Sequence, residues 1–180
     1  MLKFLNKNVV LVLLIVMAAA ACSPKFDWRE IRNEDNFFQV LMPGKAASAN
    51  REINLNGVKT TMHMTATDVQ GISFSVAYVK VDQSELEQEA SKKQQEVAFE
   101  AMKTGMLNNI QGQWVSVDQN RIPKNTLLAQ GQSPSGKKLK MLARFEKRSD
   151  YLIQIIMLGD EKAFNAEAAD MFFDSFKWNR

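Results

Sequence analysis

Two overlapping stretches carry the residue types of known phosphate and nucleophile sites. Gly131 to Lys138 nearly fits the phosphate-binding pattern G-x-x-x-x-G-K-[ST], but it ends in lysine, so the hydroxyl that would hold magnesium is missing. The following residues alternate as a strand does, whereas phosphate binding of this kind needs a helix N-terminus there. Ser135 and Lys138 have the spacing of a serine–lysine nucleophile pair, yet residues three apart in a strand point to opposite faces. Both patterns therefore predict a hairpin turn.

His63 is the only histidine, and it stands near residues that would suit either of two chemistries. With Ser73 or Ser75 it would serve a hydrolase, although the second glycine and the helix of a nucleophile elbow are absent. With Met62 and Met64 it would suit copper, but in a strand the methionines point one way and the histidine the other. We expect an exposed strand histidine, core-filling methionines, and no metal, cofactor or catalytic residue.

A basic hairpin strand is the remaining candidate surface. Lys138, Lys140 and Arg144 fall on one face of the segment 137–147, and Leu139, Met141, Ala143 and Phe145 fall on the other. Charge on an exposed strand protects a sheet from unwanted pairing. The alternative is contact between these three residues and anionic lipid headgroups, lipopolysaccharide or an acidic partner.

Residues 1–21 have the organisation of a secretory signal peptide. Lys3 and Lys7 precede an apolar run that begins at Val9, and small residues from Ala18 to Ala21 follow. The apolar stretch of 13 residues is short of the roughly 20 that a spanning helix needs. The segment therefore predicts cleavage rather than a retained transmembrane anchor.

Cys22, the only cysteine, directly follows the small residues. Ala19-Ala20-Ala21-Cys22 resembles the lipobox of bacterial lipoproteins, although leucine is commonest where Ala19 stands. The resemblance implies fatty acyl chains (palmitate among them) on Cys22, and two or more chains hold a protein stably on a membrane. Ser23, where an aspartate would signal inner-membrane retention, implies the outer membrane facing the periplasm. The alternative is a secreted protein with an incidental cysteine, which would leave an unpaired thiol in an oxidising compartment.

Composition restricts the partners of the mature chain. Cleavage leaves 159 of the 180 residues, the size of one domain, and removes two lysines and no acid. The formal net charge falls from +3 to +1, so no nucleic-acid partner is expected. Residues 22–36 are mostly polar and predict a lipidated tether, on which Trp28 is expected to pack back onto the domain.

Residues 37–180 predict a single α+β domain. Strands are expected at 37–42, 51–55, 58–67, 71–81, 114–117, 122–130, 137–147 and 151–158. The segment 151–158 is apolar on both faces, which predicts a central strand. Ser84 and Glu87 form a capping box that opens a helix ending near Asn108. Its expected buried stripe is Leu86, Ala90, Val97, Ala101, Met102, Gly105 and Met106. A last helix follows Asp160 and carries Phe164, Ala168, Met171 and Phe172 on one face. Asn56-Gly57 predicts a hairpin, so an antiparallel sheet with helices on it is expected.

The order of elements resembles the PsbP-like fold, also found in DcrB-like bacterial lipoproteins. The resemblance rests on Phe37 to Gly44, the Asn56-Gly57 hairpin, the helix end Ala101 to Met106, and the ending Phe172 to Lys177. It implies an antiparallel sheet sandwiched by helices, and a non-enzymatic accessory or docking role. No site residue is carried over.

Three functions remain open on the sequence. The first is a non-catalytic binding, docking or assembly module with an envelope protein as partner. The second is a carrier or chaperone for an apolar ligand between the sheet and the long helix, which would require a cavity. The third is a hydrolase, which would require Ser73 or Ser75 beside His63.

Overall fold

The computed structural model describes residues 25–33, 37–81 and 88–179 of the chain. The predicted signal peptide, the lipidation site Cys22 and the capping box of Ser84 and Glu87 lie outside these residues.

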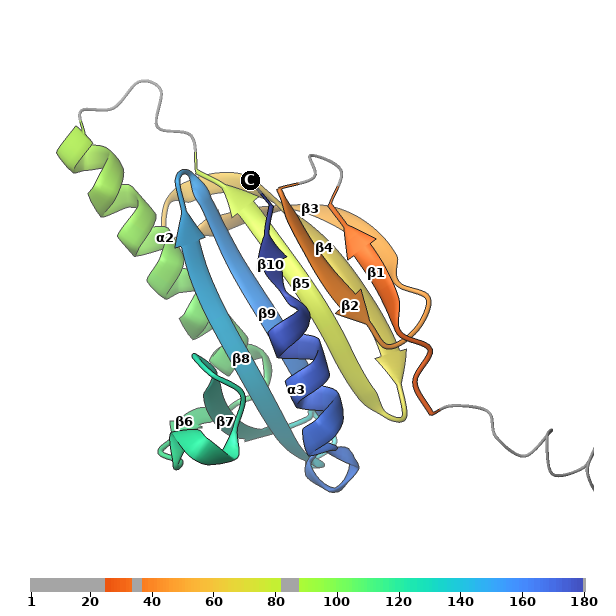
Figure 1. The fold of residues 1–180 in the computed structure, drawn as a ribbon. Coiled ribbons are helices and arrows are strands. Elements are labelled where there is room, and N and C mark those ends of the chain that lie inside the picture. The colour runs from red at the N-terminus through yellow and green to blue at the C-terminus, as the bar shows by residue number, and fades with distance from the viewer. Residues whose placement is uncertain (1–24, 34–36, 82–87, 180) are drawn as a thin grey trace, which may run out of the picture.

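A seven-stranded antiparallel sheet forms the centre of the molecule (Figure 1). Its strand order is β3-β4-β5-β9-β8-β7-β6. The strands are β3 (Ala47–Leu55), β4 (Val58–Val69), β5 (Ile72–Lys80), β6 (Gln113–Val115), β7 (Leu127–Gln132), β8 (Lys138–Arg148) and β9 (Tyr151–Asp160). The predicted Asn56-Gly57 hairpin joins β3 to β4, and both of its residues have positive φ (51° and 98°) as a tight turn of this kind requires.

A smaller antiparallel sheet lies against one face of the large one. Its strand order is β1-β2-β10, with β1 (Arg29–Arg32), β2 (Phe38–Met42) and β10 (Lys177–Trp178). The strand predicted at 37–42 is confirmed as β2, where Phe38, Val40 and Met42 are buried against the large sheet. The smaller sheet joins the two ends of the described chain in one structure.

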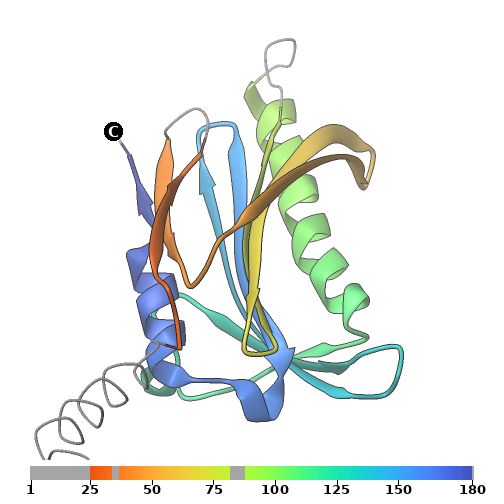
Figure 2. The same cartoon turned by 90° about the vertical axis from the view of Figure 1, so that its right-hand side faces the viewer.

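The two α-helices in the described part of the chain cover opposite faces of the large sheet (Figure 2). Helix α3 (Ala166–Ser175) and the small sheet cover one face, where Phe172 and Phe173 pack with Phe74 and Ile155. Helix α2 (Gln88–Asn109) covers the other face through Ala98 and Met102. Two single-turn 3-10 helices, η1 (Gln119–Arg121) and η2 (Glu161–Ala163), lie in the connections.

Strand β9 lies at the centre of the seven strands, as its apolar residues on both faces predict. Ile153, Ile155 and Met157 belong to the core beneath α3, whereas Leu152 and Ile156 pack on the side of α2. The expected α+β class with antiparallel pairing is therefore confirmed, and the sheet has a core on each face.

The segment 25–33 differs from the tether that the sequence predicts. Residues 29–32 form β1, which pairs with β2 from Arg29 opposite Met42 to Arg32 opposite Gln39. Phe26 and Trp28 each lie with ring centroids 6.4 Å from Phe74, so the predicted packing of Trp28 on the domain is confirmed. The sequence gives little sign of β1, because only Ile31 among its four residues is half-buried and the other three are exposed.

Candidate functional site

His63 and the two candidate serines lie on opposite faces of the sheet. His63 pairs across strands with Tyr78, and the two rings stack with centroids 4.8 Å apart. Ser73 and Ser75 stand an odd number of residues before Tyr78 in β5, so their side chains point to the other face. The strand pairing therefore rules out a serine–histidine arrangement of these residues.

The two methionines beside His63 occupy different environments. Both point to the face opposite His63; Met62 packs against the core under α2, whereas Met64 is 41% exposed. The prediction of a core position was therefore wrong for Met64, because α2 does not extend over that part of β4. In the described ranges, no group of three histidine, cysteine, aspartate or glutamate side chains has metal-binding geometry.

The phosphate-loop look-alike is a hairpin, as predicted. Strand β7 ends at Gln132, Gly136 adopts φ of 77°, and β8 begins at Lys138. The hydroxyl of Ser133 accepts a hydrogen bond from the Lys137 backbone N–H at 3.1 Å. Beside this turn, residues of β7 and β8 with Gln111 and Glu161 line a hollow of about 440 Å³.

The three basic residues predicted to share an exposed face do not do so. Lys138 is exposed, and Lys140 is half-buried with its ammonium 5.0 Å from the ring centroid of Phe164. Arg144 is only 7% exposed. The prediction of an anionic-surface contact was therefore wrong for Arg144, which is covered by α3.

The Arg144 guanidinium instead links β8 by hydrogen bonds to α3 and to the connection that follows η1. It donates to the carbonyl oxygen of Phe173 at 2.8 Å and to that of Lys124 at 2.5 Å. The Phe173 carbonyl belongs to the last turn of α3, where no helical N–H remains to satisfy it. Burial lowers the pKa of Arg144, and the nearby carboxylates of Glu146 and Asp174 oppose that shift. Arg144 is thus a structural C-terminal contact for α3.

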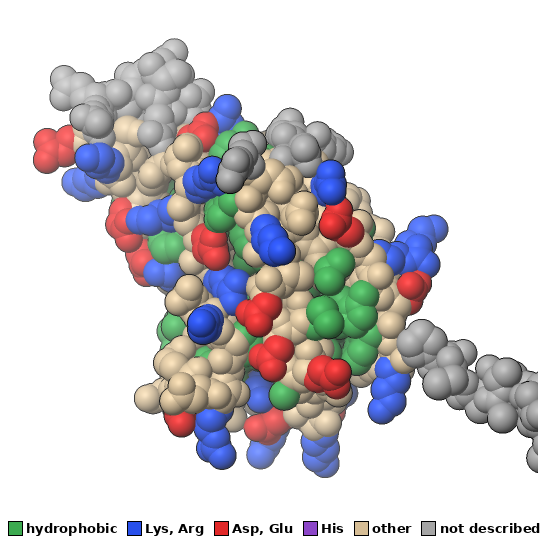
Figure 3. All heavy atoms as spheres, viewed as in Figure 1, with side chains coloured by type: hydrophobic (Ala, Val, Ile, Leu, Met, Phe, Trp, Pro, Cys, Tyr) green, Lys and Arg blue, Asp and Glu red, His purple; other side chains and the backbone are tan. Residues whose placement is uncertain are grey.

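An apolar groove with an acidic border lies between α3 and β2. It has a volume of about 570 Å³ and is lined by Leu41, Glu167, Asp170, Met171, Asp174 and Ser175. Met171 is 45% exposed, the most exposed large apolar side chain described. Figure 3 shows apolar side chains beside α3 with acidic ones along their border. We call this feature the α3 groove.

Local structure fixes the α3 groove firmly. The side chain of Asn165 caps α3 by accepting the Ala168 N–H at 2.9 Å, and Phe172 and Phe173 are fully buried beneath the helix. At the far end, the Ser175 hydroxyl accepts the Leu41 N–H at 2.9 Å and donates to the Phe172 carbonyl at 2.7 Å. These bonds hold β2 beside α3, so the groove is preformed.

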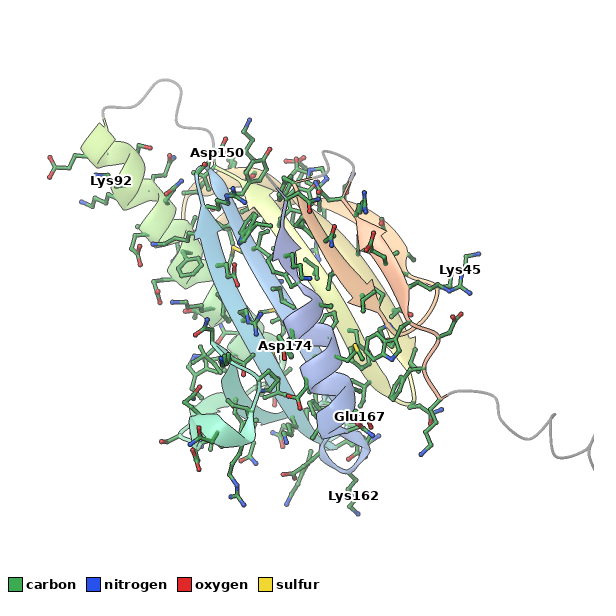
Figure 4. The ribbon with its side chains drawn as sticks, viewed as in Figure 1. Lys45, Lys92, Asp150, Lys162, Glu167 and Asp174 are labelled. Atoms are coloured by element: carbon green, nitrogen blue, oxygen red, sulfur yellow. The ribbon has the colours of Figure 1, made fainter. Side chains whose placement is uncertain are left out.

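The carboxylates of the α3 groove have no counter-charge among its lining residues. Glu167, Asp170 and Asp174 follow at helical spacing along α3, and Figure 4 shows the two labelled ones, Glu167 and Asp174, on that helix. In the described part of the chain, none of the three makes an ion pair with a lysine or arginine. Asp170 and Asp174 also border a second hollow, on the side of residues 119–124.

The sequence pattern missed this groove because it assigned Met171 to the buried side of the last helix. The buried residues are Ala168, Ala169, Phe172 and Phe173, which leaves Met171 facing outward. The signal that would have shown this is the acidic spacing 167, 170 and 174, which marks the outer face that Met171 shares.

The interface between α2 and the sheet is filled rather than hollow. Ala98, Met102, Val79 and Leu152 are each at most 2% exposed, and α2 contributes no lining residue to the α3 groove or to the hollow beside the β7–β8 turn. Over residues 25–33, 37–81 and 88–179, no helix has the length and apolarity needed to cross a bilayer.

Comparisons with protein-family models, with curated proteins and with solved structures found no match for this chain.

Proposed function

We propose that this chain is a bacterial lipoprotein that works as a non-catalytic docking module on a membrane. The leader of residues 1–21 and the solitary Cys22 after four alanines support an acyl anchor at that cysteine. The same features, with Ser23, support the outer membrane facing the periplasm as the location. We further propose that the domain has the PsbP-like arrangement, which a sheet with a helix on each face is consistent with.

The observation that carries the docking role is the α3 groove. Exposed apolar surface bordered by charge is typical of protein interfaces. Its acidic border complements a basic partner, so we propose that it receives a segment of an envelope protein with an apolar side chain between lysines or arginines. The carrier alternative is less well supported, because apolar side chains pack closely beneath α2.

The anchor is tested by labelled fatty-acid incorporation in intact bacteria. The expected result is a labelled protein that loses its label in the Cys22→Ser variant. Equal labelling of the two proteins would exclude acylation at Cys22.

The docking surface is tested by a photo-crosslinking residue at position 171 in intact cells. The control places the same residue at position 97, because Val97 is also exposed (37%) but lies on α2, across the sheet. We expect one discrete adduct from position 171, none of the same mass from position 97, and at least a several-fold loss of the adduct with Asp170→Lys. An adduct that forms equally from both positions, or that survives Asp170→Lys unchanged, would contradict a charged docking groove.

A further inference from the structure

The packed segment 25–33 sets how far the domain stands from its anchor. Phe26 and Trp28 contact Phe74, and the Asp27 N–H donates to the Pro43 carbonyl at 3.1 Å. The domain therefore begins at Phe26. Four residue steps separate Phe26 from Cys22, and a fully extended chain covers about 14 Å in four steps. A tether free up to residue 36 would have reached about 50 Å.

The strand register shows which end of the sheet lies near that anchor. The Asp27–Pro43 contact is at the end of β2, and the chain then enters β3 at Ala47, opposite Ala66 near the end of β4. The turn from β4 to β5 lies at the same end, since Ile72 pairs with Gly159 at the end of β9. Gly159 in turn pairs with Lys140 near the start of β8. We call this the anchor end.

Exposed lysines are distributed across the anchor end. Lys25, Lys45, Lys138 and Lys162 are all exposed and make no ion pair with the described carboxylates. Figure 4 shows Lys45 and Lys162 at this end and Lys92 at the opposite end of the molecule.

The acidic side chains at the anchor end are partly neutralised. Asp27 pairs with Arg29 at 2.6 Å, and Asp160 pairs with Lys137 at 3.2 Å. Asp68 and Glu161 remain exposed there, and Glu167 begins the acidic face of α3 beside them. Among the described residues, four unpaired lysines and three exposed carboxylates therefore remain at the anchor end, a small excess of positive charge.

We infer that the anchor end faces the bilayer and that its lysines contact anionic lipid headgroups. The inference rests on the proposed acylation of Cys22, and it adds an orientation and a lipid class to it. Acyl chains combined with nearby basic side chains bind anionic membranes more strongly than acyl chains alone. The hairpin of Asn56 and Gly57, at the other end of the sheet, then points away from the membrane.

The orientation is tested on the full lipidated protein by energy transfer to a headgroup-labelled lipid. Because acylation consumes the thiol of the only native cysteine, one introduced cysteine takes the donor dye alone. Ser135→Cys places the dye at the β7–β8 turn of the anchor end, and Lys59→Cys places it beside the distal hairpin. Vesicles are phosphatidylcholine alone or an equimolar mixture with phosphatidylglycerol.

We expect greater transfer from position 135 than from position 59, with a larger difference on the anionic vesicles. Lys138→Glu with Lys162→Glu should return that difference to its value on neutral vesicles. The matched pair Lys92→Glu with Lys93→Glu, far from the anchor end, should leave it unchanged.

Three negative outcomes would each contradict a different part of the inference. Equal transfer from the two positions would overturn the orientation. If the difference in energy transfer between the two positions changes neither with phosphatidylglycerol nor with the charge reversals, the contact with lipid headgroups is contradicted. If the protein does not float with phosphatidylcholine vesicles, or floats equally well as Cys22→Ser, the acyl anchor itself fails.

Discussion

Arg144 shows that one buried charged side chain can organise this fold. Its guanidinium satisfies carbonyl oxygens of α3 and of the 119–124 connection from a position in β8. The sequence could not reveal this, because charged residues at alternate positions are typical of a strand with one face in solvent. Strand β8 is instead covered on both faces, so Arg144 and the core residue Leu142 share the side under α3.

Arg144→Met is expected to lower the free energy of unfolding by about 1.5–3 kcal/mol, since one buried and one partly buried carbonyl lose a charged donor. Urea unfolding followed by tryptophan fluorescence measures the change. Lys140→Met, a half-exposed cation on the same face, should stay within about 0.5 kcal/mol of the parent protein. Equal losses in the two variants would contradict the structural role of Arg144.

The interactions of Asp160 are expected to stabilise the fold less in acid than at neutral pH. Its pKa is lowered by the hydrogen bond from the Lys162 backbone N–H and by the Lys137 ammonium. Because the folded pKa lies below the ordinary 3.8, the stabilisation is complete above that value and is lost as the pH falls through the folded pKa. In a pH series of thermal unfolding, Asp160→Asn should therefore differ less from the parent at low pH than at neutral pH. A difference independent of pH would exclude this linkage.

At the scale of elements, the sequence predicted the sheet better than the surfaces around it. Apolar alternation and turn residues predicted most of the strands, because the apolar side chains of a strand with a core on one side recur at every second residue. The long helix was placed correctly over its described part, but Ala90 and Val97 of its expected buried stripe are exposed. Its position over the sheet depends on tertiary contacts, such as Phe99 against Phe145, that no local pattern encodes.

Trp28 and the adjoining strand β1 allow a direct test of structure that the sequence did not predict. Trp28→Ala should destabilise the domain by about 1–3 kcal/mol, less than the 3–5 kcal/mol typical of a fully buried aromatic because Trp28 is only half-buried. Thermal unfolding measures this, with Arg32→Ala, at an exposed residue of the adjoining β1, as the control. No effect of Trp28→Ala would mean that residues 25–33 behave as a free tether.

At the scale of the whole molecule, three surfaces have separate places. The acidic α3 groove lies along one helix, the lysine-bearing anchor end lies at one edge of the sheet, and α2 closes the opposite face. Neither the groove nor the anchor end is contiguous in the sequence. The anchor end joins residues from distant strands and turns, so a linear pattern could not predict it. The groove adds Leu41 of β2 to the outer face of α3, and only the acidic spacing of that face is visible in the sequence.

A longer tether should abolish the orientation without affecting the fold. A flexible glycine–serine insert of about 25 residues between Pro24 and Lys25 would have a root-mean-square span of about 25–30 Å. The difference in energy transfer between positions 135 and 59 should then nearly vanish on phosphatidylcholine vesicles, while the thermal unfolding temperature stays the same. A retained difference would mean that contacts other than the tether length orient the domain.

The early start of the domain at Phe26 also bears on affinity. A binding surface held close to a bilayer explores a thin layer, so any partner in that layer meets it at a high effective concentration. Recognition there does not require tight binding in solution, and an interface the size of the α3 groove would suffice. Binding measured with the detached domain should therefore understate the occupancy reached on the membrane.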